Sequence, residues 1–488
     1  MLKSIFTFSF FTVISRVSGL IRDICIARVI GTTYLADIFF SAFRFANLFR
    51  AFFAEGAFTT SFIPLYSRHN DKQASDFASS VIFITCIILL LFCLIIQILL
   101  PILIKGFIPG FEQDKFYTTV TLSRIMTPYI IFISVTSLIG GILQVKNHFT
   151  STAISPIILN ISLTVSLFMP YINTPVHNLA ISVLVGGILQ LLLIVFSAYK
   201  LNVKFSLNFS LNDQVKLFFK RVIPATINNC AAQIIIWINT IIASFLPNAV
   251  SYIYYADRLV QLPQGVIGVA ISTVLLPIIS KKINEKSNII KIQNKALIIG
   301  LIFIMPTTAA FILIPDVILL AIFNYSINFN HCAVAPVLTV FSLSLPAFVI
   351  NKVLLPLFFA QGKLKIPMIF SLICLVINIM LNLLLINKYQ HIAIAIATSA
   401  STWVNSILLL YYLKTYKAYQ ISQSLLLSII KILISTIVMS IALYIMNSFL
   451  RSLFFDKILI RLAILIILSI IIYFTTLYLI FLRQPEVI

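Results

Sequence analysis

Charged residues are scarce in this sequence, and their scarcity indicates where the protein resides. Asp, Glu, Lys and Arg make up 10% of its 488 residues, whereas 61% are hydrophobic and the mean hydropathy is +1.10. Soluble domains carry about 25% charged residues, so this chain cannot present a water-compatible surface. The composition therefore predicts a protein embedded in lipid, without a soluble domain.

Motifs for nucleotide hydrolysis, covalent catalysis and metal binding are also missing. No GxxxxGK[ST] loop is present, and the six cysteines and five histidines lack metal-ligand spacing. We therefore expect no enzyme activity, no cofactor, no metal site and no nucleotide partner. Any transport must then be driven by a gradient, an electrical potential or substrate flow.

Apolar runs close to 20 residues long recur along the whole chain, which is the length of a membrane-spanning helix. Membrane barrels show only short alternating segments. We predict an all-α polytopic membrane protein with about 14 transmembrane helices. The first run is long, contains charges and lacks a small-residue cleavage site, so we expect it to remain in the mature protein. The spans centre near Ser15, Leu48, Ile88, Ile133, Ile161, Leu189, Ile234, Val266, Ile304, Leu343, Val376, Thr398, Ile437 and Ile470.

The formal net charge of +21 reports topology rather than nucleic-acid binding, because the lysines fall between the spans. Alternate connections are basic, and by the positive-inside rule they face the cytoplasm. We predict a multi-pass protein of the cell inner (plasma) membrane with both termini in the cytoplasm. The basic connections lie near residues 68–72, 146, 200–221, 281–295, 363–365 and 414–417.

Two stretches about 220 residues apart resemble each other and predict an internal repeat. Residues 36–37 (AD) and 62–68 (FIPLYSR) are echoed by residues 256–257 (AD) and 275–281 (LLPIISK). Farther along, three landmarks recur in the same order, with Pro128, Gln144 and Asn160 matched by Pro346, Gln361 and Asn378.

Each copy of the repeat would contain six spans, so both copies enter the membrane in the same orientation. They are then related by a pseudo-two-fold axis along the membrane normal. We predict an N-terminal lobe at residues 1–207 (TM1–6), a C-terminal lobe at residues 208–420 (TM7–12) and a terminal helix pair at residues 421–488 (TM13–14). Substrate sites in such proteins lie between the repeats.

The predicted spans carry charges that each cost on the order of 2.5–3.5 kcal/mol at the membrane centre. We interpret the arginines as a positive cavity for a phosphate-bearing head group, since guanidinium forks match phosphate oxygens. The acidic residues would orient them or form gating ion pairs. The alternative is snorkelling or static salt bridges, which is plausible for Arg28, Arg44 and Asp23. The candidate binding residues are Arg16, Arg22, Arg50 and Arg258, and the candidate gating or orienting residues are Asp37, Glu55 and Asp257.

Several motifs resemble the bacterial lipid II flippase family, MurJ (also called MviN). In the first seventy residues they are 15–23 (SRVSGLIRD), 36–40 (ADIFF), 45–50 (FANLFR) and 53–58 (FAEGAF), and in the second copy 254–259 (YYADRL) and 263–270 (PQGVIGVA). The resemblance implies the fold of the multidrug/oligosaccharidyl-lipid/polysaccharide (MOP) exporter superfamily. It implies alternating-access transfer of lipid II, the undecaprenyl-pyrophosphate-linked peptidoglycan precursor, from the cytoplasmic to the periplasmic leaflet.

The resemblance also implies roles for particular residues and segments. The four arginines look like the family's cavity arginines, Asp37 like its important aspartate, and Glu55 and Asp257 like acidic gating positions. The terminal helix pair would form a groove for the lipid tail. Some relatives bind sodium through acidic side chains, whereas the nearest polar residues here are uncharged, which favours the membrane potential over sodium as the drive. These polar residues are Asn239, Asn378 and Asn382.

Three alternatives remain open at this stage. The protein could transport another lipid-linked oligosaccharide, or it could be a MATE-like drug exporter, although cationic drugs call for an acidic cavity. It could also be a non-transporting scaffold for cell-wall assembly, which would need no charges inside its spans. Lys352 and Arg124 could each lie near a membrane interface, and we interpret both as structural.

Overall fold

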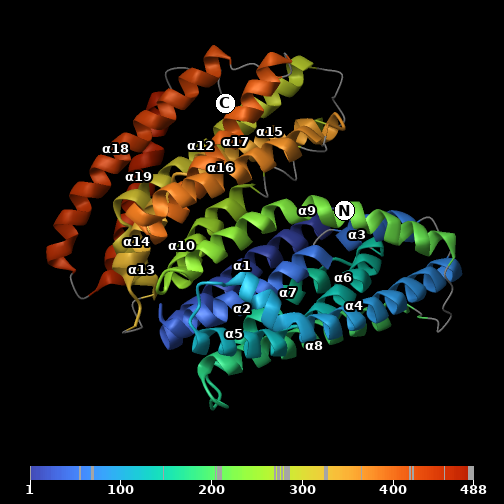
Figure 1. Ribbon diagram of the computed structural model, residues 1–488. Coiled ribbons are helices and arrows are strands. Elements are labelled where there is room, and N and C mark those ends of the chain that lie inside the picture. Colours follow the sequence, from blue (N-terminus) through green and yellow to red (C-terminus); the bar gives the residue numbers. More distant parts are fainter. Residues whose placement is uncertain are drawn as a thin grey trace. The chain divides into compact units, whose positions relative to one another are not determined.

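The structure is a computed structural model, and nearly all of the chain that it describes is helical (Figure 1). No β-strand occurs within the described residues, so the predicted all-α fold is confirmed. The described residues are 2–53, 57–67, 71–146, 148–203, 205, 212–268, 271, 275, 278–279, 286–323, 328–363, 365–416, 419, 422–454 and 457–481.

Nine helical segments of the described chain are long and apolar enough to cross a membrane, which confirms a polytopic membrane protein. The count of 14 spans stays a prediction. Helix α1, for example, spans Leu2–Ile30, contains several charged residues and is not among the nine. The nine segments are Gln73–Phe107, Gln113–Val145, Pro175–Lys200, Asn288–Leu313, His331–Ala360, Lys365–Tyr389, His391–Thr415, Gln423–Leu453 and Ile458–Ile480.

The chain divides into two compact units. The first comprises Met1–Ser251 with Ser326–Asn328, and the second comprises Tyr252–Tyr325 with Phe329–Ile488. This division follows the density of contacts, whereas the boundaries predicted after residues 207 and 420 follow the sequence repeat. Those lobe boundaries therefore stay predictions.

In the first unit, α7 packs on α1 and α8, while α9 packs on α2, α3 and α4. Shorter helices form where connections interrupt the apolar runs. The helices of this unit are α1 (Leu2–Ile30), α2 (Tyr34–Phe53), α3 (Ala57–Tyr66), α4 (Asp71–Phe107), α5 (Gln113–Met126), α6 (Tyr129–Val145), α7 (Thr150–Ser166), α8 (Pro175–Lys200), α9 (Asp213–Ser244) and the start of α10 (Ala249–Pro263).

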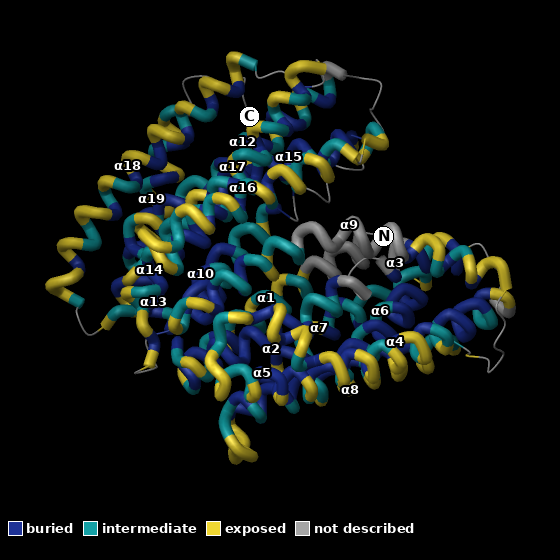
Figure 2. The backbone as a smooth tube through the Cα atoms, viewed as in Figure 1, coloured by how far each residue is buried: buried dark blue, intermediate teal, exposed yellow. Residues whose placement is uncertain are grey.

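Aromatic residues hold part of the first unit together. The ring of Phe62 on α3 packs against Tyr66, Phe77 and Phe218, with centroid distances of 5.4, 5.5 and 6.1 Å. The outer side of α4, by contrast, exposes large apolar side chains such as Ile98 (Figure 2). An apolar surface of this kind is stable only against lipid.

In the second unit, the terminal helix pair packs on the rest mainly where α18 meets α12 and where α19 meets α13. Both helices expose rows of apolar side chains, as a lipid-facing surface requires. The elements after α10 are η1 (Gln264–Gly268), α12 (Lys286–Leu313), α13 (Pro315–Phe323), α14 (His331–Ser342), α15 (Leu345–Ala360), α16 (Lys365–Tyr389), α17 (His391–Thr415), α18 (Gln423–Leu453) and α19 (Ile458–Phe481).

Each unit contains one interrupted helix at a matching point of the sequence repeat. In the first unit α5 ends at Met126 and α6 begins at Tyr129, directly after Pro128. In the second unit α14 ends at Ser342, and α15 begins at Leu345, next to Pro346. Proline lacks a backbone N–H and cannot continue the hydrogen-bond ladder, so it breaks the helix in both copies.

Candidate functional site

Arg22 lies in a buried ion pair on α1. Its side chain is 6% exposed, and its Nε and Nη2 donate to Oδ1 of the adjacent Asp23 at 3.0 and 2.7 Å. Its Nη1 donates to Oδ1 of Asn160 on α7 at 2.9 Å. A buried guanidinium is tolerated only when its charge is offset and its donors are satisfied. The pair with Asp23 and the amide of Asn160 supply both conditions.

Asn160 also fixes α7 against α1. Its Nδ2 donates to the carbonyl oxygen of Ser15 at 3.1 Å and to the hydroxyl of Ser18 at 2.9 Å. An added Cβ on Gly19 would meet the same amide at 3.5 Å, so the two helices are in van der Waals contact here. Asn160 is therefore a residue of this site that sequence reasoning used only as a repeat landmark.

The other predicted arginines of the first unit have different surroundings. Helix α1 is continuous through Ser18 and Gly19, and Arg16 is half-buried, whereas Arg22 is buried. Arg50, in the last turn of α2, donates from Nε to Oδ1 of Asn47 at 2.9 Å. The three arginines therefore lie on two helices, and Arg22 and Arg50 bond to different residues.

The side chain of Asp37 caps the N-terminal end of α10. Its side chain is 1% exposed, and Oδ1 accepts a hydrogen bond of 2.8 Å from the backbone N–H of Ser251. Backbone N–H groups in the first turn of a helix lack helical partners, and the helix dipole favours a negative charge there. Asp37 thus acts as an N-terminal cap supplied from 214 residues away. In this structure the Asp37 carboxylate therefore binds a helix end.

Asp257 and Arg258 of the second unit are bridged by a neutral side chain. Gln261 donates from Nε2 to Oδ2 of Asp257 at 2.5 Å and accepts from Nη1 of Arg258 at 3.2 Å. The guanidinium carbon of Arg258 lies 4.8 Å from the centroid of the Tyr254 ring, within the range of a cation–π contact. All of these residues except Tyr254 are only half-buried.

The helix that carries this cluster becomes irregular one turn later. The α-helix ends at Pro263, and Gln264–Gly268 form a π-helical turn. Pro263, Gly265 and Gly268 favour an irregular helix at this point, and the structure contains one. Single π-helical turns are common at functional sites.

The other described residues that the sequence suggested range from exposed to fully buried. Glu55 lies outside the described residues. Lys352 is half-buried, with Nζ 5.3 Å from the centroid of the Phe348 ring, and the side chain of Arg124 is exposed. Asn378 and Asn382 are fully buried, and Nδ2 of Asn382 donates to Oδ1 of Asn378 at 3.1 Å.

Comparison with known sequences gives one consistent result. The family model described as "Lipid II flippase MurJ" matches residues 26–465. A protein of Rickettsia prowazekii (strain Madrid E) named "Probable lipid II flippase MurJ" is 36% identical over 487 residues, covering 96% of both chains. "Lipid II flippase MurJ" of Burkholderia cenocepacia is 30% identical, covering 86% of this chain and 84% of the relative.

Solved structures agree with the sequence comparison. The chain is similar to "Lipid II flippase MurJ, inward closed conformation", with a TM-score of 0.85, 26% identity and coverage of 98% of this chain and 99% of the other. It also resembles an inward-facing MATE family multidrug transporter of the MOP superfamily, with a TM-score of 0.69 and 15% identity over 82% of this chain and 94% of the other. The second likeness concerns the fold alone.

Proposed function

Since this chain belongs to the lipid II flippase MurJ family, we propose that it moves lipid II from the cytoplasmic to the periplasmic leaflet of the inner membrane. The observation that carries the proposal is the family match over residues 26–465, together with a relative of 36% identity along nearly the whole chain. A MATE-like fold alone would not distinguish lipid II from a drug, whereas the match along the whole sequence does.

The proposed mechanism is alternating access. Arg16, Arg22, Arg50 and Arg258 bind the pyrophosphate while the lipid tail stays in the membrane. Asp37, Glu55 and Asp257 orient these arginines or exchange ion pairs between states. Charge-assisted hydrogen bonds from guanidinium groups to phosphate oxygens are the strong class of hydrogen bond. Their strength would offset part of the cost of dehydrating the head group.

The ion pair of Arg22 supports a role in exchange. Asp23 neutralises Arg22 at a bond distance of 2.7 Å, and an arriving pyrophosphate would compete with this carboxylate for the same guanidinium. Replacing one anionic partner by another keeps the buried charge compensated throughout. Substrate binding and a change in the α1–α7 contact at Asn160 would then be coupled.

The half-buried Arg258 supports a more direct role. Its Nη1 donates to the neutral side chain of Gln261 at 3.2 Å, and a phosphate oxygen can replace this neutral acceptor. Arg258 is therefore the residue at which substrate binding is tested most cleanly.

The proposal includes no catalytic step, cofactor, nucleotide or nucleic acid. Both termini lie in the cytoplasm, and the membrane potential drives transport. Asn378 and Asn382 bond to one another, and neither supplies the negative charge that a sodium site favours. Transport that stops when sodium is removed at constant potential would contradict this drive.

The first test is replacement of a known flippase. Cells depleted of their own lipid II flippase should grow when this chain is expressed, and purified protein in proteoliposomes should move lipid II between leaflets. A lipid-linked oligosaccharide with another head group is the comparison substrate. Transport of that lipid in place of lipid II would reject the proposed substrate.

The second test concerns Arg258. Arg258→Ala should lower lipid II translocation about tenfold or more, because a charge-assisted hydrogen bond contributes about 1.5–3 kcal/mol. The matched control is Arg124→Ala, which removes an exposed arginine side chain and keeps the backbone carbonyl that accepts a hydrogen bond from Gln97. Equal translocation by both variants would remove Arg258 from the substrate site.

A further inference from the structure

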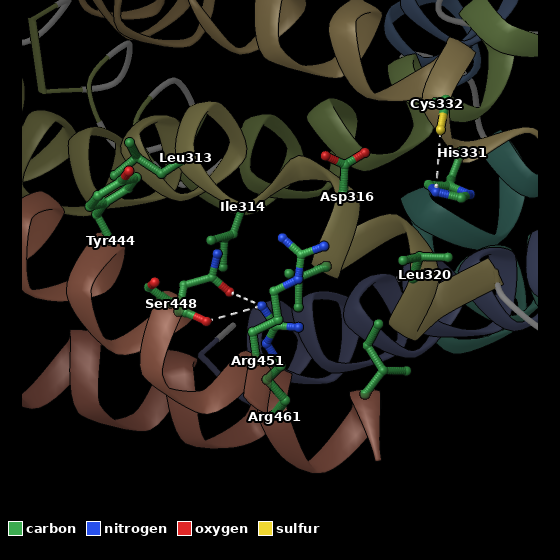
Figure 3. Close-up of a pocket in the computed structure, with 13 residues that line it drawn as sticks. Leu313, Ile314, Asp316, Leu320, His331, Cys332, Tyr444, Ser448, Arg451 and Arg461 are labelled. Carbon is green, nitrogen blue, oxygen red and sulfur yellow. Dashed lines mark hydrogen bonds between the residues drawn. The ribbon is translucent and has the colours of Figure 1, made fainter. Parts of the chain in front are cut away.

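A polar pocket of about 740 Å³ lies within the second unit, and none of the candidate site residues lines it (Figure 3). Its walls come from α13, the start of α14, the end of α18 and the start of α19. The volume lies in the range of small-molecule sites. Two arginines from the terminal helix pair line it, although these helices otherwise expose apolar side chains.

Arg461 is a fixed part of this pocket. Its side chain is 7% exposed, and its Nη2 donates to the carbonyl oxygen and to Oδ1 of Asn447 at 3.1 and 2.6 Å. The partners are neutral, so they orient the guanidinium without offsetting its charge. Its Nε is buried and has no hydrogen-bond partner among the described residues. A buried cation of this kind is costly unless an anion compensates it.

Arg451 brings a second positive charge to the same pocket. It lies in the last turn of α18, with its side chain exposed, and Figure 3 shows it beside Arg461. Asp316 lines the pocket, but among the described residues no ion pair joins it to either arginine. Two guanidinium groups and one carboxylate leave the lining with a net positive charge.

The level of the pocket along the membrane normal suits a lipid head group. Helix α18 begins after the basic region near residues 414–417 and extends over about 46 Å, so Arg451 lies at its opposite end. Arg461 lies in the first turn of α19. Both arginines are thus at helix ends, where the polar surface of a bilayer begins. With the predicted topology, this surface is the periplasmic one.

We propose that this pocket binds an anionic phosphate group at the membrane surface, through Arg451 and the Asn447-oriented Arg461. Guanidinium groups bind phosphate oxygens through paired hydrogen bonds, and basic pockets between membrane helices accept phospholipid head groups. The phosphate is carried by an anionic lipid or is free in solution. The inference does not depend on lipid II transport, so either can fail without the other.

The experiment measures binding of dioctanoyl phosphatidylglycerol to the full-length protein in detergent by microscale thermophoresis. Dioctanoyl phosphatidylcholine serves as the lipid without net charge, and inorganic phosphate is titrated in a separate arm. Arg451→Gln changes an exposed side chain, so the fold is retained. Arg461→Lys keeps the charge but removes the guanidinium fork. Arg124→Gln is the control for loss of one surface charge elsewhere.

We expect phosphatidylglycerol to bind more tightly than phosphatidylcholine, and Arg451→Gln and Arg461→Lys each to weaken it about tenfold. Arg124→Gln should bind like the unmodified protein. If inorganic phosphate binds with the same dependence on Arg451, free phosphate is a ligand; if only the lipid binds, the source is the head group. Binding of both ligands within twofold of the unmodified protein by Arg451→Gln and Arg461→Lys would overturn the proposal.

Discussion

Two sets of charged residues, one in each unit, are held in different ways. In the first unit Arg22 and Asp37 are buried and bonded to charged or backbone partners. In the second unit Asp257 and Arg258 are half-buried and joined through the amide of Gln261. Breaking the contacts of the buried first set costs more free energy, because the charges left behind are not solvated. The second set is accessible to solvent, so its contacts can rearrange at a lower cost.

The difference indicates a division of labour. A buried, paired charge stabilises one arrangement of helices, because breaking the pair leaves its partner uncompensated. A half-buried charge that remains accessible to solvent can bind an anion at little structural cost. We therefore expect variants of the first set to lose stability as well as transport, and variants of the second set to lose transport with little loss of stability. Two pairs of charged-residue variants test this contrast, and a pair of glycine variants tests the related contrast between a packed and an open position. They are given from the largest expected effect to the smallest.

The sharpest contrast compares two arginines. Arg22→Ala should lower the free energy of unfolding by about 3–5 kcal/mol, because Asp23 remains buried without its partner. Arg258→Ala should lower it by about 1 kcal/mol or less, because that side chain is half-buried. Thermal unfolding of the purified proteins in detergent measures both.

The control for this pair removes both charges together. Arg22→Met combined with Asp23→Leu should recover most of the lost stability, because an apolar pair of similar volume replaces a buried ion pair at little cost. Transport should nevertheless remain defective if Arg22 binds substrate. Equal destabilisation by Arg22→Ala and Arg258→Ala would break the comparison.

Two glycines with positive φ give the second test. Gly31, with φ of +57°, packs so closely on Asn328 that an added Cβ would lie 2.6 Å from its carbonyl oxygen. Gly362 has φ of +68° and open space around it. Gly31→Ala should cost about 2–4 kcal/mol of unfolding free energy and Gly362→Ala about 1–2 kcal/mol. A similar loss of stability at both positions would show that the backbone strain of a positive φ, and not the close contact with Asn328, determines the loss.

The two aspartates give the smallest difference. Asp37→Ala removes the cap of α10 and leaves the N–H of Ser251 buried, so we expect a loss of about 1–3 kcal/mol. Asp257→Ala should cost less than about 1 kcal/mol. Asp37→Asn keeps an acceptor oxygen and should recover part of the stability. If Asp257→Ala proves more destabilising than Asp37→Ala, the structural role assigned to the first set, Arg22 and Asp37, is wrong.

Hydrophobic patterning predicted the positions of the helices well, because membrane spans need long apolar runs whatever their neighbours are. The irregular turn after Pro263 was predicted from local residues and is present as a π-helix. The interruption at Leu343 was missed, since the apolar run continues through it and the break depends on Pro346. The local sequence was thus sufficient to predict the helices, but it was insufficient to predict where some of them end.

The partners of the site residues could not be predicted. Asn160 reaches Arg22 across 138 residues, and Ser251 reaches Asp37 across 214, so both contacts exist only after helices pack. The pocket at Arg461 was also missed, because a charge near a helix end is usually solvated. The closeness of Arg451 and Arg461 in sequence was the available signal.

The adjacency of Arg22 and Asp23 has a consequence for biogenesis. Their bond needs no residue outside α1, so it can form while the first span is entering the bilayer and before α7 has been synthesised. Inserting a pair with no net charge is less costly than inserting a lone arginine. The nascent segment can therefore enter the membrane with Arg22 already neutralised, and Asn160 completes the arrangement when its own span arrives.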